Sequence, residues 1–268
     1  KAIKKNKIQI SQYYGFGILA AGKKAQPVAD FVNGMSEVCI KIMHMIITIA
    51  PFGVFGLITP VVATNGPDIL LPLLKLILVA YLAMILHMVV VYSGMVKAIA
   101  KMGPLTFFKG QVRAMTFAFA SASSVGTLPI NMECSEKLGV RREVSSFVLP
   151  LGATINMDGT AIYQGVCAIF IAQVFGIDLT IGQQCVIIMT AVLSSIGTAG
   201  VPGSGMIMLA MVLQSVGLPV EGIALVAGVD RVLDMMRTVV NITGDQSAAV
   251  CVDSLEKRKE ARQAVKAA

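Results

Sequence analysis

Apolar stretches long enough to cross a lipid bilayer restrict the fold of this chain more than any other feature. They run over Val38–Ala63, Ile69–Val96 and Val144–Phe175. A spanning helix needs about 20 apolar residues, because the hydrocarbon core is about 30 Å thick and each helical residue rises about 1.5 Å. Only 14% of the residues are charged, whereas soluble domains carry about a quarter. The sequence therefore predicts an all-α integral membrane protein in contact with a lipid bilayer.

The distribution of Lys and Arg predicts the orientation of these helices. Residues 64–68, between the first two stretches, contain no Lys or Arg, whereas Lys97 and Arg113 follow the second stretch. Since positive residues favour the cytoplasmic side, the first helix is predicted to run outward and the second to return. The last apolar segment, residues 222–252, precedes the basic run 257–259. We expect a multi-pass protein of the cell (plasma or inner) membrane with a cytoplasmic C-terminus.

Two shorter stretches are predicted to enter the membrane and turn back. Residues 114–132 have basic residues on both flanks, so a single crossing would place one basic cluster outside. Residues 179–217 have no Lys or Arg at either end, and the Gly-rich residues 194–205 divide them into halves too short to cross. We therefore predict two re-entrant helical hairpins, the first opening from the cytoplasm and the second from outside.

The two hairpin tips have similar sequences. Residues 123–129 read Ser-Ser-Val-Gly-Thr-Leu-Pro, and residues 194–202 read Ser-Ser-Ile-Gly-Thr-Ala-Gly-Val-Pro. Because the hairpins have opposite orientations, this similarity predicts an inverted repeat, and paired Gly/Pro-broken segments in such repeats mark a transport site near the bilayer midplane. The alternative is that small residues only allow close helix packing.

These predictions divide the chain into seven parts. They are an N-terminal remnant with the end of a preceding helix (1–26), two transmembrane helices (27–104), the first re-entrant hairpin (105–143), a broken transmembrane helix (144–178), the second hairpin (179–219), a transmembrane helix with a polar stripe (220–254) and a basic cytoplasmic tail (255–268).

The last apolar segment carries a stripe of polar residues. At about 100° per residue, five of them fall within an arc of roughly 80°: Asp230, Asp234, Arg237, Asn241 and Asp245. A charge at the bilayer centre costs about 2.5–3.5 kcal/mol on insertion scales, so such a stripe needs partners and marks a functional site by default. The alternative is Asp–Arg pairing that only holds the helices together.

The Val144–Phe175 stretch contains Asn156-Met157-Asp158-Gly159-Thr160 near its middle. We expect the glycine to permit local unwinding, which frees backbone carbonyls beside the Asn and Asp oxygens. An all-oxygen cavity of this kind suits sodium or a proton relay. The alternative is that Asn156 and Asp158 only cap a second half-helix.

Other patterns exclude several classes of protein. The five cysteines lack C-x-x-C spacing and a paired His, which argues against a disulfide framework, a zinc site or a thiol nucleophile. There is no phosphate-binding Gly loop and no Ser/His/Asp set. The net charge of +7 comes from short clusters with few aromatic residues, so we expect no nucleic-acid partner. Lys75 and His87 are predicted to have structural roles.

Four motifs carry a family resemblance: Ser-Ser-x-Gly-Thr-Leu-Pro, Asn-Met-Asp-Gly-Thr, Ser-Ile-Gly-Thr-Ala-Gly-Val-Pro-Gly and Asp-x-x-x-Asp-x-x-Arg-Thr-x-x-Asn-x-x-Gly-Asp. With them, residues 22–254 resemble the dicarboxylate/amino acid:cation symporter family, the glutamate transporters, and among these the prokaryotic sodium-coupled aspartate and glutamate transporters. The resemblance implies an elevator-type transport domain, a homotrimer, and a secondary active symporter rather than an enzyme. Its coupling ions would be sodium, with no other cofactor.

The resemblance also implies substrate-binding roles. Ser123 and Ser124 at the first tip, with Val201 through Gly205 at the second, would hold the α-carboxylate of an acidic amino acid. Asp234 would accept its ammonium group, and Arg237 would bind its side-chain carboxylate. The site would be completed by Met157, Thr160, Thr238 and Asn241.

Three sodium sites are implied in the same way. The first would be formed by Gly152, Asn156, Asn241 and Asp245. The second would be formed by Thr154, Ser195, Ile196 and Thr198. The third would use Asn156 and Asp158 with residues of an earlier helix outside this sequence.

Two positions depart from the family pattern. Family members usually place an Arg either at the first tip or directly after the substrate-binding Asp, but here those positions are Ala122 and Met235. Three alternatives to sodium-coupled uptake of aspartate or glutamate remain. They are a proton-coupled dicarboxylate or glutamate symporter, a membrane-embedded enzyme using Asp158 or Asp234 as acid/base, and an ion channel.

Overall fold

The computed structural model describes residues 20–196 and 198–267, which form helices and connecting turns with no strand in those ranges. The all-α prediction is confirmed for this part of the chain. The chain divides into two units, residues 1–53 and 54–268, which are described separately. The predicted remnant 1–26 lies largely outside the described residues.

A single helix, α2 (Gln26–Asn65), follows the short 3-10 helix η1 (Gly22–Ala25) and contains the predicted segment 38–63. Pro51 and Pro60 lie within it and do not end it. Its length of 40 residues exceeds the prediction at both ends, because residues 26–37 and 64–65 continue the helix beyond the apolar segment.

A second long helical run covers Pro67–Ala100 and is long and apolar enough to span a membrane by length and composition. It comprises η2 (Pro67–Ile69), α3 (Leu70–His87), η3 (Met88–Tyr92), α4 (Ser93–Met95) and η4 (Val96–Ala100). Both η3 and η4 are π-helical. Such insertions in helices occur frequently at functional sites, so the run is not the uniform α-helix that its apolar sequence suggests.

The first predicted hairpin corresponds to the helices α5 (Pro104–Ser121) and α6 (Ser124–Lys137), which pack against each other. Only Ala122 and Ser123 separate them. The turn is therefore much shorter than the tip motif 123–129 suggests. Ser123 is the N-cap of α6, and its hydroxyl accepts a 3.0 Å hydrogen bond from the Gly126 N–H, so the helix starts before the Gly and Pro of the motif.

The second predicted hairpin corresponds to α9 (Ile181–Ser195) and α10 (Ser204–Ser215), which also pack against each other. Thr180 and Gln183 form a reciprocal capping box at the start of α9. The longer connection 196–203 contains Gly197, which lies outside the described residues. Re-entry of either hairpin into a membrane stays a prediction.

The broken helix is present as α7 (Arg142–Ile155) and α8 (Asp158–Val174), separated by Asn156 and Met157. The sequence suggested that Gly159 is the point of unwinding. In the structure Gly159 instead lies in the first turn of α8. A Cβ atom there would overlap the backbone carbonyl of Arg237. The glycine therefore allows α8 to approach the last helix closely.

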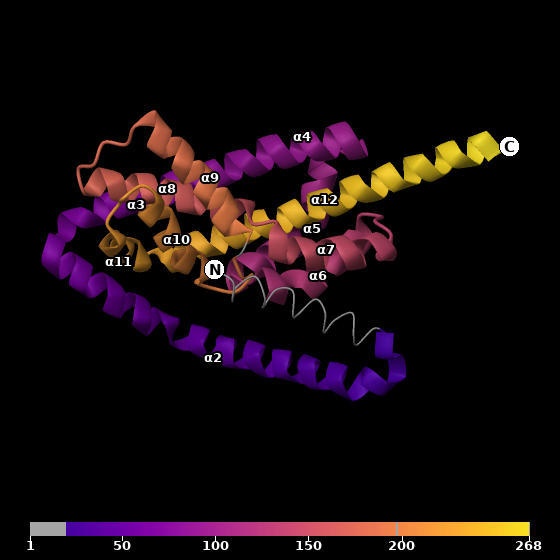
Figure 1. The fold of residues 1–268 in the computed structure, drawn as a ribbon, viewed down its shortest axis with the longest axis horizontal. Helices are drawn as coiled ribbons and strands as arrows, with labels where there is room; N and C mark the ends of the chain where they lie inside the picture. The colour runs from indigo at the N-terminus through magenta and orange to yellow at the C-terminus, as the bar shows by residue number, and fades with distance from the viewer. Residues whose placement is uncertain (1–19, 197, 268) are drawn as a thin grey trace. The chain divides into compact units, whose positions relative to one another are not determined.

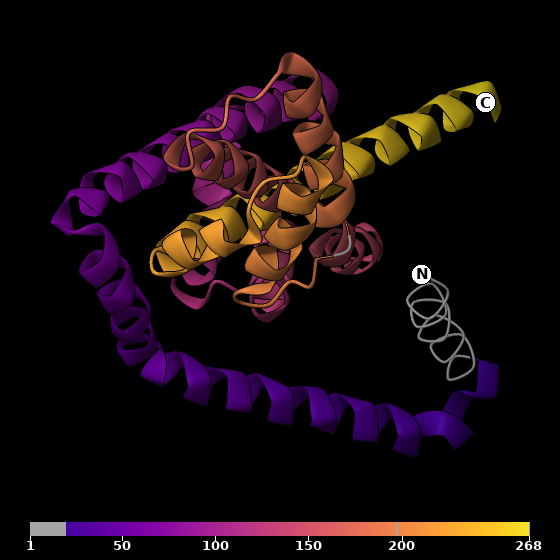
Figure 2. The same cartoon turned by 60° about the vertical axis from the view of Figure 1, so that its left-hand side comes forward.

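The last helix, α12 (Asp230–Ala267), begins after η5 (Val220–Gly222) and α11 (Ile223–Ala227) and continues through the predicted tail. Within residues 54–268 it contacts α3, α5, α6, α7 and α8, and Figures 1 and 2 show these helices gathered around its first half. The polar stripe is therefore enclosed by helices that precede it in the chain.

A cluster of ion pairs joins α12 to the turn between α6 and α7. Arg141 Nε lies 2.7 Å from Asp253 Oδ1, and Lys257 Nζ lies 2.6 Å from Asp253 Oδ2. Lys257 also donates to the Gly139 carbonyl at 2.9 Å. These contacts fix the end of the first hairpin to the helix that carries the polar stripe.

Candidate functional site

The five stripe residues of α12 are all buried. None of them is more than 5% exposed: Asp230 5%, Asp234 1%, Arg237 3%, Asn241 3% and Asp245 1%. Each therefore depends on protein partners for its polar atoms, since burying an unpaired charge or polar group is costly.

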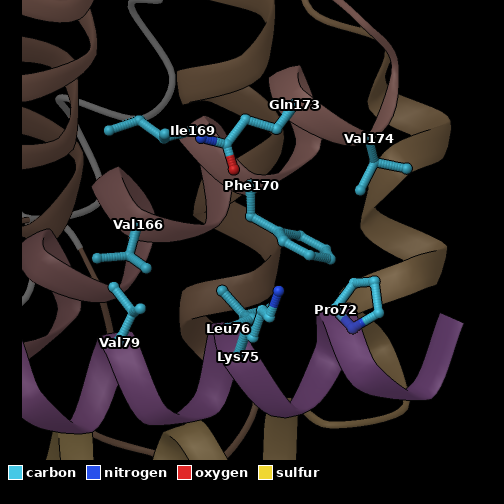
Figure 3. Close-up of a pocket in the computed structure, with 9 residues that line it drawn as sticks. All are labelled: Pro72, Lys75, Leu76, Val79, Val166, Ile169, Phe170, Gln173 and Val174. Carbon is cyan, nitrogen blue, oxygen red and sulfur yellow. The ribbon is translucent and has the colours of Figure 1, made fainter.

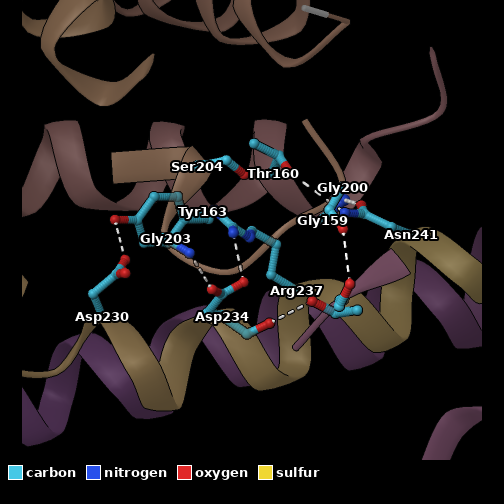
Figure 4. A network of polar contacts seen from close by, with 12 residues as sticks. Gly159, Thr160, Tyr163, Gly200, Gly203, Ser204, Asp230, Asp234, Arg237 and Asn241 are labelled. Atoms are coloured by element: carbon cyan, nitrogen blue, oxygen red, sulfur yellow. Dashed lines mark hydrogen bonds and ion pairs between the residues drawn. The ribbon is translucent and has the colours of Figure 1, made fainter. Parts of the chain in front are cut away.

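An ion pair forms the centre of the stripe. Arg237 Nη2 lies 2.5 Å from Asp234 Oδ1, and the N–H of Gly203 donates to Asp234 Oδ2 at 2.8 Å (Figure 4). The guanidinium also lies over the Tyr163 ring, 5.3 Å from its centroid. Arg237 Nη1 is buried and has no hydrogen-bond partner among the described residues. A strong donor is therefore available for an anionic group.

Gly205 permits this arrangement of the arginine. A Cβ atom at Gly205 would overlap the Arg237 guanidinium, so any larger residue would displace the guanidinium. Glycine at the start of α10 is thus required by the arginine of α12, a contact between residues 32 positions apart that the motif alone does not reveal.

Asp230 has a partner of its own. Tyr163 Oη donates to Asp230 Oδ1 at 2.6 Å (Figure 4). The aromatic ring thus lies between two members of the stripe, with its face toward Arg237 and its hydroxyl on Asp230. This pair holds α8 against α12 and supports the structural interpretation of Asp230.

Asn241 connects α12 to the break between α7 and α8. Its Oδ1 accepts from the Gly159 N–H at 2.8 Å, and its Nδ2 donates to Thr160 Oγ1 at 3.3 Å. Nδ2 also lies 3.2 Å from the Met157 sulfur. Thr238 Oγ1 donates to the Asp234 carbonyl at 2.9 Å. The four residues predicted to complete the substrate site are thus brought together.

The two hairpin tips contact each other above this cluster. Ser123 Oγ donates to the Gly200 carbonyl at 3.1 Å, and the Val125 N–H donates to the same oxygen at 3.2 Å. A Cβ atom at Gly200 would lie 3.0 Å from the Ala153 carbonyl oxygen and 3.2 Å from Ser124 Cβ. The absence of a side chain at Gly200 therefore lets the tips meet.

A small cavity lies beneath the tips. Its volume is about 10 Å³, which is about the space of one water. Seven residues predicted to bind substrate line it: Ser124, Met157, Thr160, Val201, Arg237, Thr238 and Asn241. The other predicted substrate residues, Ser123, Gly205 and Asp234, adjoin it through the contacts described above. Binding of an amino acid would require the tips to separate from this closed arrangement.

The residues of the first predicted sodium site also come together. Asn156 Nδ2 lies 2.9 Å from Asp245 Oδ1 and 3.2 Å from the Asn241 carbonyl oxygen. A Cβ atom at Gly152 would lie 2.5 Å from Asp245 Oδ1, so the carboxylate packs directly against the α7 backbone. Carboxylate, amide and backbone oxygens of this kind fit a hard cation.

The hydroxyl groups of the second predicted sodium site are engaged in local hydrogen bonds, and the site stays a prediction. The hydroxyls of Thr154, Ser195 and Thr198 donate to carbonyls three or four residues earlier in their own segments, namely Leu151, Val192 and Ser194. Ile196 is 48% exposed. Among the described residues, no hydrogen bond joins Thr154 to the other three.

Asp158, the carboxylate of the third predicted site, has two partners that the sequence interpretation missed. Tyr92 Oη donates to Asp158 Oδ2 at 2.9 Å, and His87 Nε2 lies 3.2 Å from the same oxygen. His87 thus contacts a candidate ion ligand, and its predicted structural role stays a prediction. One signal was available in the sequence: His87 and Tyr92 are polar groups five residues apart in an otherwise apolar stretch.

Two further observations concern metal-binding clusters and a second cavity. In residues 20–196 and 198–267, no group of three or more His, Cys, Asp or Glu side chains could hold a metal ion. A larger groove of about 510 Å³ lies between α3 and α8 (Figure 3), with mostly apolar walls beside Lys75 and Gln173. It shares no residue with the predicted site.

Known proteins share extensive sequence similarity with this chain. Residues 8–255 match the sodium:dicarboxylate symporter family. The chain is 40% identical over 252 residues to a proton/sodium-glutamate symport protein of Geobacillus stearothermophilus. It is 37% identical to a proton/glutamate-aspartate symporter of Escherichia coli and 38% identical to human excitatory amino acid transporter 2.

These alignments cover most of this chain but only part of each relative. They include 93%, 96% and 92% of the chain, respectively, but 59%, 59% and 44% of the three relatives. The chain thus spans about three fifths of the length of the two bacterial relatives. Because the family match covers nearly the whole sequence, the chain belongs to the sodium:dicarboxylate symporter family, a family of membrane transport proteins.

Proposed function

We propose that this chain forms the substrate- and ion-binding part of a symporter that uses a sodium gradient to take up aspartate or glutamate. The observation that carries the proposal is the Arg237–Asp234 pair, buried where the two tips meet, with Arg237 Nη1 left without a hydrogen bond among the described residues. A buried guanidinium beside a carboxylate can recognise a zwitterion with an acidic side chain.

Each group of the proposed substrate has a complementary partner. Arg237 binds the side-chain carboxylate, and Asp234 accepts the ammonium group after its contact with Gly203 opens. Ser123, Ser124 and the second tip hold the α-carboxylate, since the N-termini of α6 and α10 favour an anion. This assignment is supported by the position of Ser124 and Val201 on the cavity and of Ser123 at the tip contact.

Sodium coupling is proposed to act through the neighbouring oxygen ligands. Asp245, Asn156 and Gly152 hold one ion beside Asn241, whose side chain contacts the substrate cluster through Thr160. Thr154, Ser195, Ile196 and Thr198 would form a second site only when the second tip rearranges. Asp158 and Asn156 contribute to a third. An ion bound here stabilises the closed tip, and the closed tip retains the amino acid.

The remaining features of the whole protein are also proposals. We propose a multi-pass protein of the cell membrane with a cytoplasmic C-terminus, two re-entrant hairpins, and elevator-type movement within a homotrimer. The basic run 257–259 after the polar stripe supports the orientation of the last helix. The family membership supports the rest by analogy.

A binding experiment tests the proposed substrate and ion. Aspartate, glutamate, serine and succinate are titrated into purified protein in sodium chloride and in choline chloride at constant ionic strength. Aspartate or glutamate should bind in sodium only, and serine and succinate should bind weakly. Sodium-independent binding that strengthens at low pH would instead favour the proton-coupled alternative.

A further inference from the structure

Arg231 of α12 contacts the first hairpin tip. Its Nη2 donates to the carbonyl oxygens of Ala120 at 3.2 Å and Ser121 at 3.4 Å. These are carbonyls of the last turn of α5, which ends at Ser121 and has Ala122 as its C-cap. Among the described residues, Arg231 has no carboxylate within ion-pair distance, so the tip carbonyls are its polar partners.

The end of α5 has two properties that make this contact effective. The last carbonyls of a helix lack intrahelical donors and carry the negative end of the helix dipole, so a cation is favoured there. In addition, Ala122 adopts a left-handed conformation with φ of 52°, which is unfavourable for a residue with a Cβ atom. The tip is therefore held in its observed conformation partly by groups outside it.

The position of this tip decides whether the site is closed. Ala122 and Ser124 line the small cavity, and Ser123 and Val125 contact Gly200 of the second tip. A displacement of the first tip would break these contacts. Arg231 thus connects closure of the cavity to the same helix that carries Asp234 and Arg237.

We infer that Arg231 is a positioning residue that holds the first tip closed over the substrate site and thereby slows release of the bound amino acid. The inference rests on the proposed function. It also accounts for the departures at Ala122 and Met235, because Arg231 supplies a guanidinium to the tip from a third position. Met235 lies four residues later, on the same face of α12.

The test measures sodium-dependent aspartate affinity and dissociation rate in Arg231→Ala, with Arg113→Ala as the matched control. Arg113 is an exposed arginine of the same hairpin that pairs with Glu133. Loss of a hydrogen bond from a charged donor predicts about tenfold faster dissociation and about tenfold weaker affinity for Arg231→Ala only. Adding Met235→Arg should return both values toward those of the parent.

Hydrogen exchange of residues 120–126 gives a readout that needs no ligand, and it should increase in Arg231→Ala but not in Arg113→Ala. Thermal unfolding of the same samples checks the fold, and Arg231→Gln replaces Arg231→Ala if the latter does not fold. An unchanged dissociation rate, or a double variant as fast as Arg231→Ala, would overturn the inference. If the parent protein itself shows no sodium-dependent aspartate binding, the proposed function fails, whereas the exchange result still tests the contact.

Discussion

Replacement of Arg237 by Cys should convert the site from acidic to neutral amino acids. The guanidinium is 3% exposed, Nη2 is paired with Asp234, and Nη1 lacks a hydrogen bond. One charge-assisted hydrogen bond from Nη1 to the substrate carboxylate contributes about 1.5–3 kcal/mol. Since about 1.4 kcal/mol is a factor of ten, aspartate affinity should fall about ten- to a hundredfold in Arg237→Cys.

The loss would be larger if Asp234 releases Nη2 when the substrate binds, because both nitrogens would then contact the carboxylate. The assay is isothermal titration of aspartate, serine and cysteine into the purified variant at saturating sodium. Serine or cysteine affinity should be unchanged or improved, because these ligands carry no side-chain carboxylate. Arg113→Cys, which removes an exposed arginine, serves as the control and should behave like the parent.

A stability measurement must accompany this assay. Removal of Arg237 leaves the Asp234 carboxylate, 1% exposed, with the backbone N–H of Gly203 as its one remaining hydrogen-bond donor among the described residues. Breaking a buried pair on one side costs about 3–5 kcal/mol of stability, so the variant should melt at a lower temperature in the absence of substrate. Arg237→Lys keeps a positive charge without the planar fork and should bind aspartate with intermediate affinity. Unchanged aspartate affinity in folded Arg237→Cys would refute the assignment.

Three other predictions concern coupling and gating. Asp245→Asn should raise the sodium concentration needed for half-maximal aspartate binding, because it replaces a carboxylate at a cation site; the same sodium dependence as the parent would make Asp245 structural. Tyr92→Phe should weaken sodium binding about tenfold or more through loss of the hydrogen bond that orients Asp158, whereas Tyr81→Phe, which removes a hydroxyl bonded to a backbone carbonyl, should not. A spin label at Ala199 should become less mobile when sodium and aspartate are added together, and equal mobility in both conditions during active transport would exclude the second tip as the gate.

The polar stripe is the part of the site that sequence reasoning predicts best. Helical periodicity alone places Asp234, Arg237, Asn241 and Asp245 on one face, and the structure shows them buried against α7, α8 and the second tip. The prediction succeeds because it depends on one continuous helix. No knowledge of the neighbouring helices is needed.

The hairpin tips show what local patterns cannot predict. Gly126 and Pro129 suggested a long first turn, but Ser123 caps α6 and the helix includes both residues. Pro129 lies inside α6 beyond its first turn, so the helix continues although one i→i−4 hydrogen bond is lost there. The capping hydroxyl of Ser123, three residues before Gly126, therefore marks the start of α6 better than the glycine does.

Sequence patterns also did not predict contacts between residues far apart in the chain. His87 and Tyr92 reach Asp158 across 71 and 66 positions, and Arg231 reaches the first tip across 111 and 110. The π-helical segment Met88–Tyr92 changes the angular position of Tyr92, which a count at 100° per residue does not anticipate. These contacts depend on how the helices pack, and apolar periodicity predicts only that they pack.

Uptake by proteoliposomes tests the central claim most directly. Radiolabelled aspartate and glutamate are supplied outside vesicles loaded with potassium, with sodium either outside only, equal on both sides, or absent. The account predicts concentrative uptake with the inward sodium gradient, equilibration without accumulation at equal sodium, and no uptake without sodium. Equal accumulation of aspartate with and without the sodium gradient would contradict it.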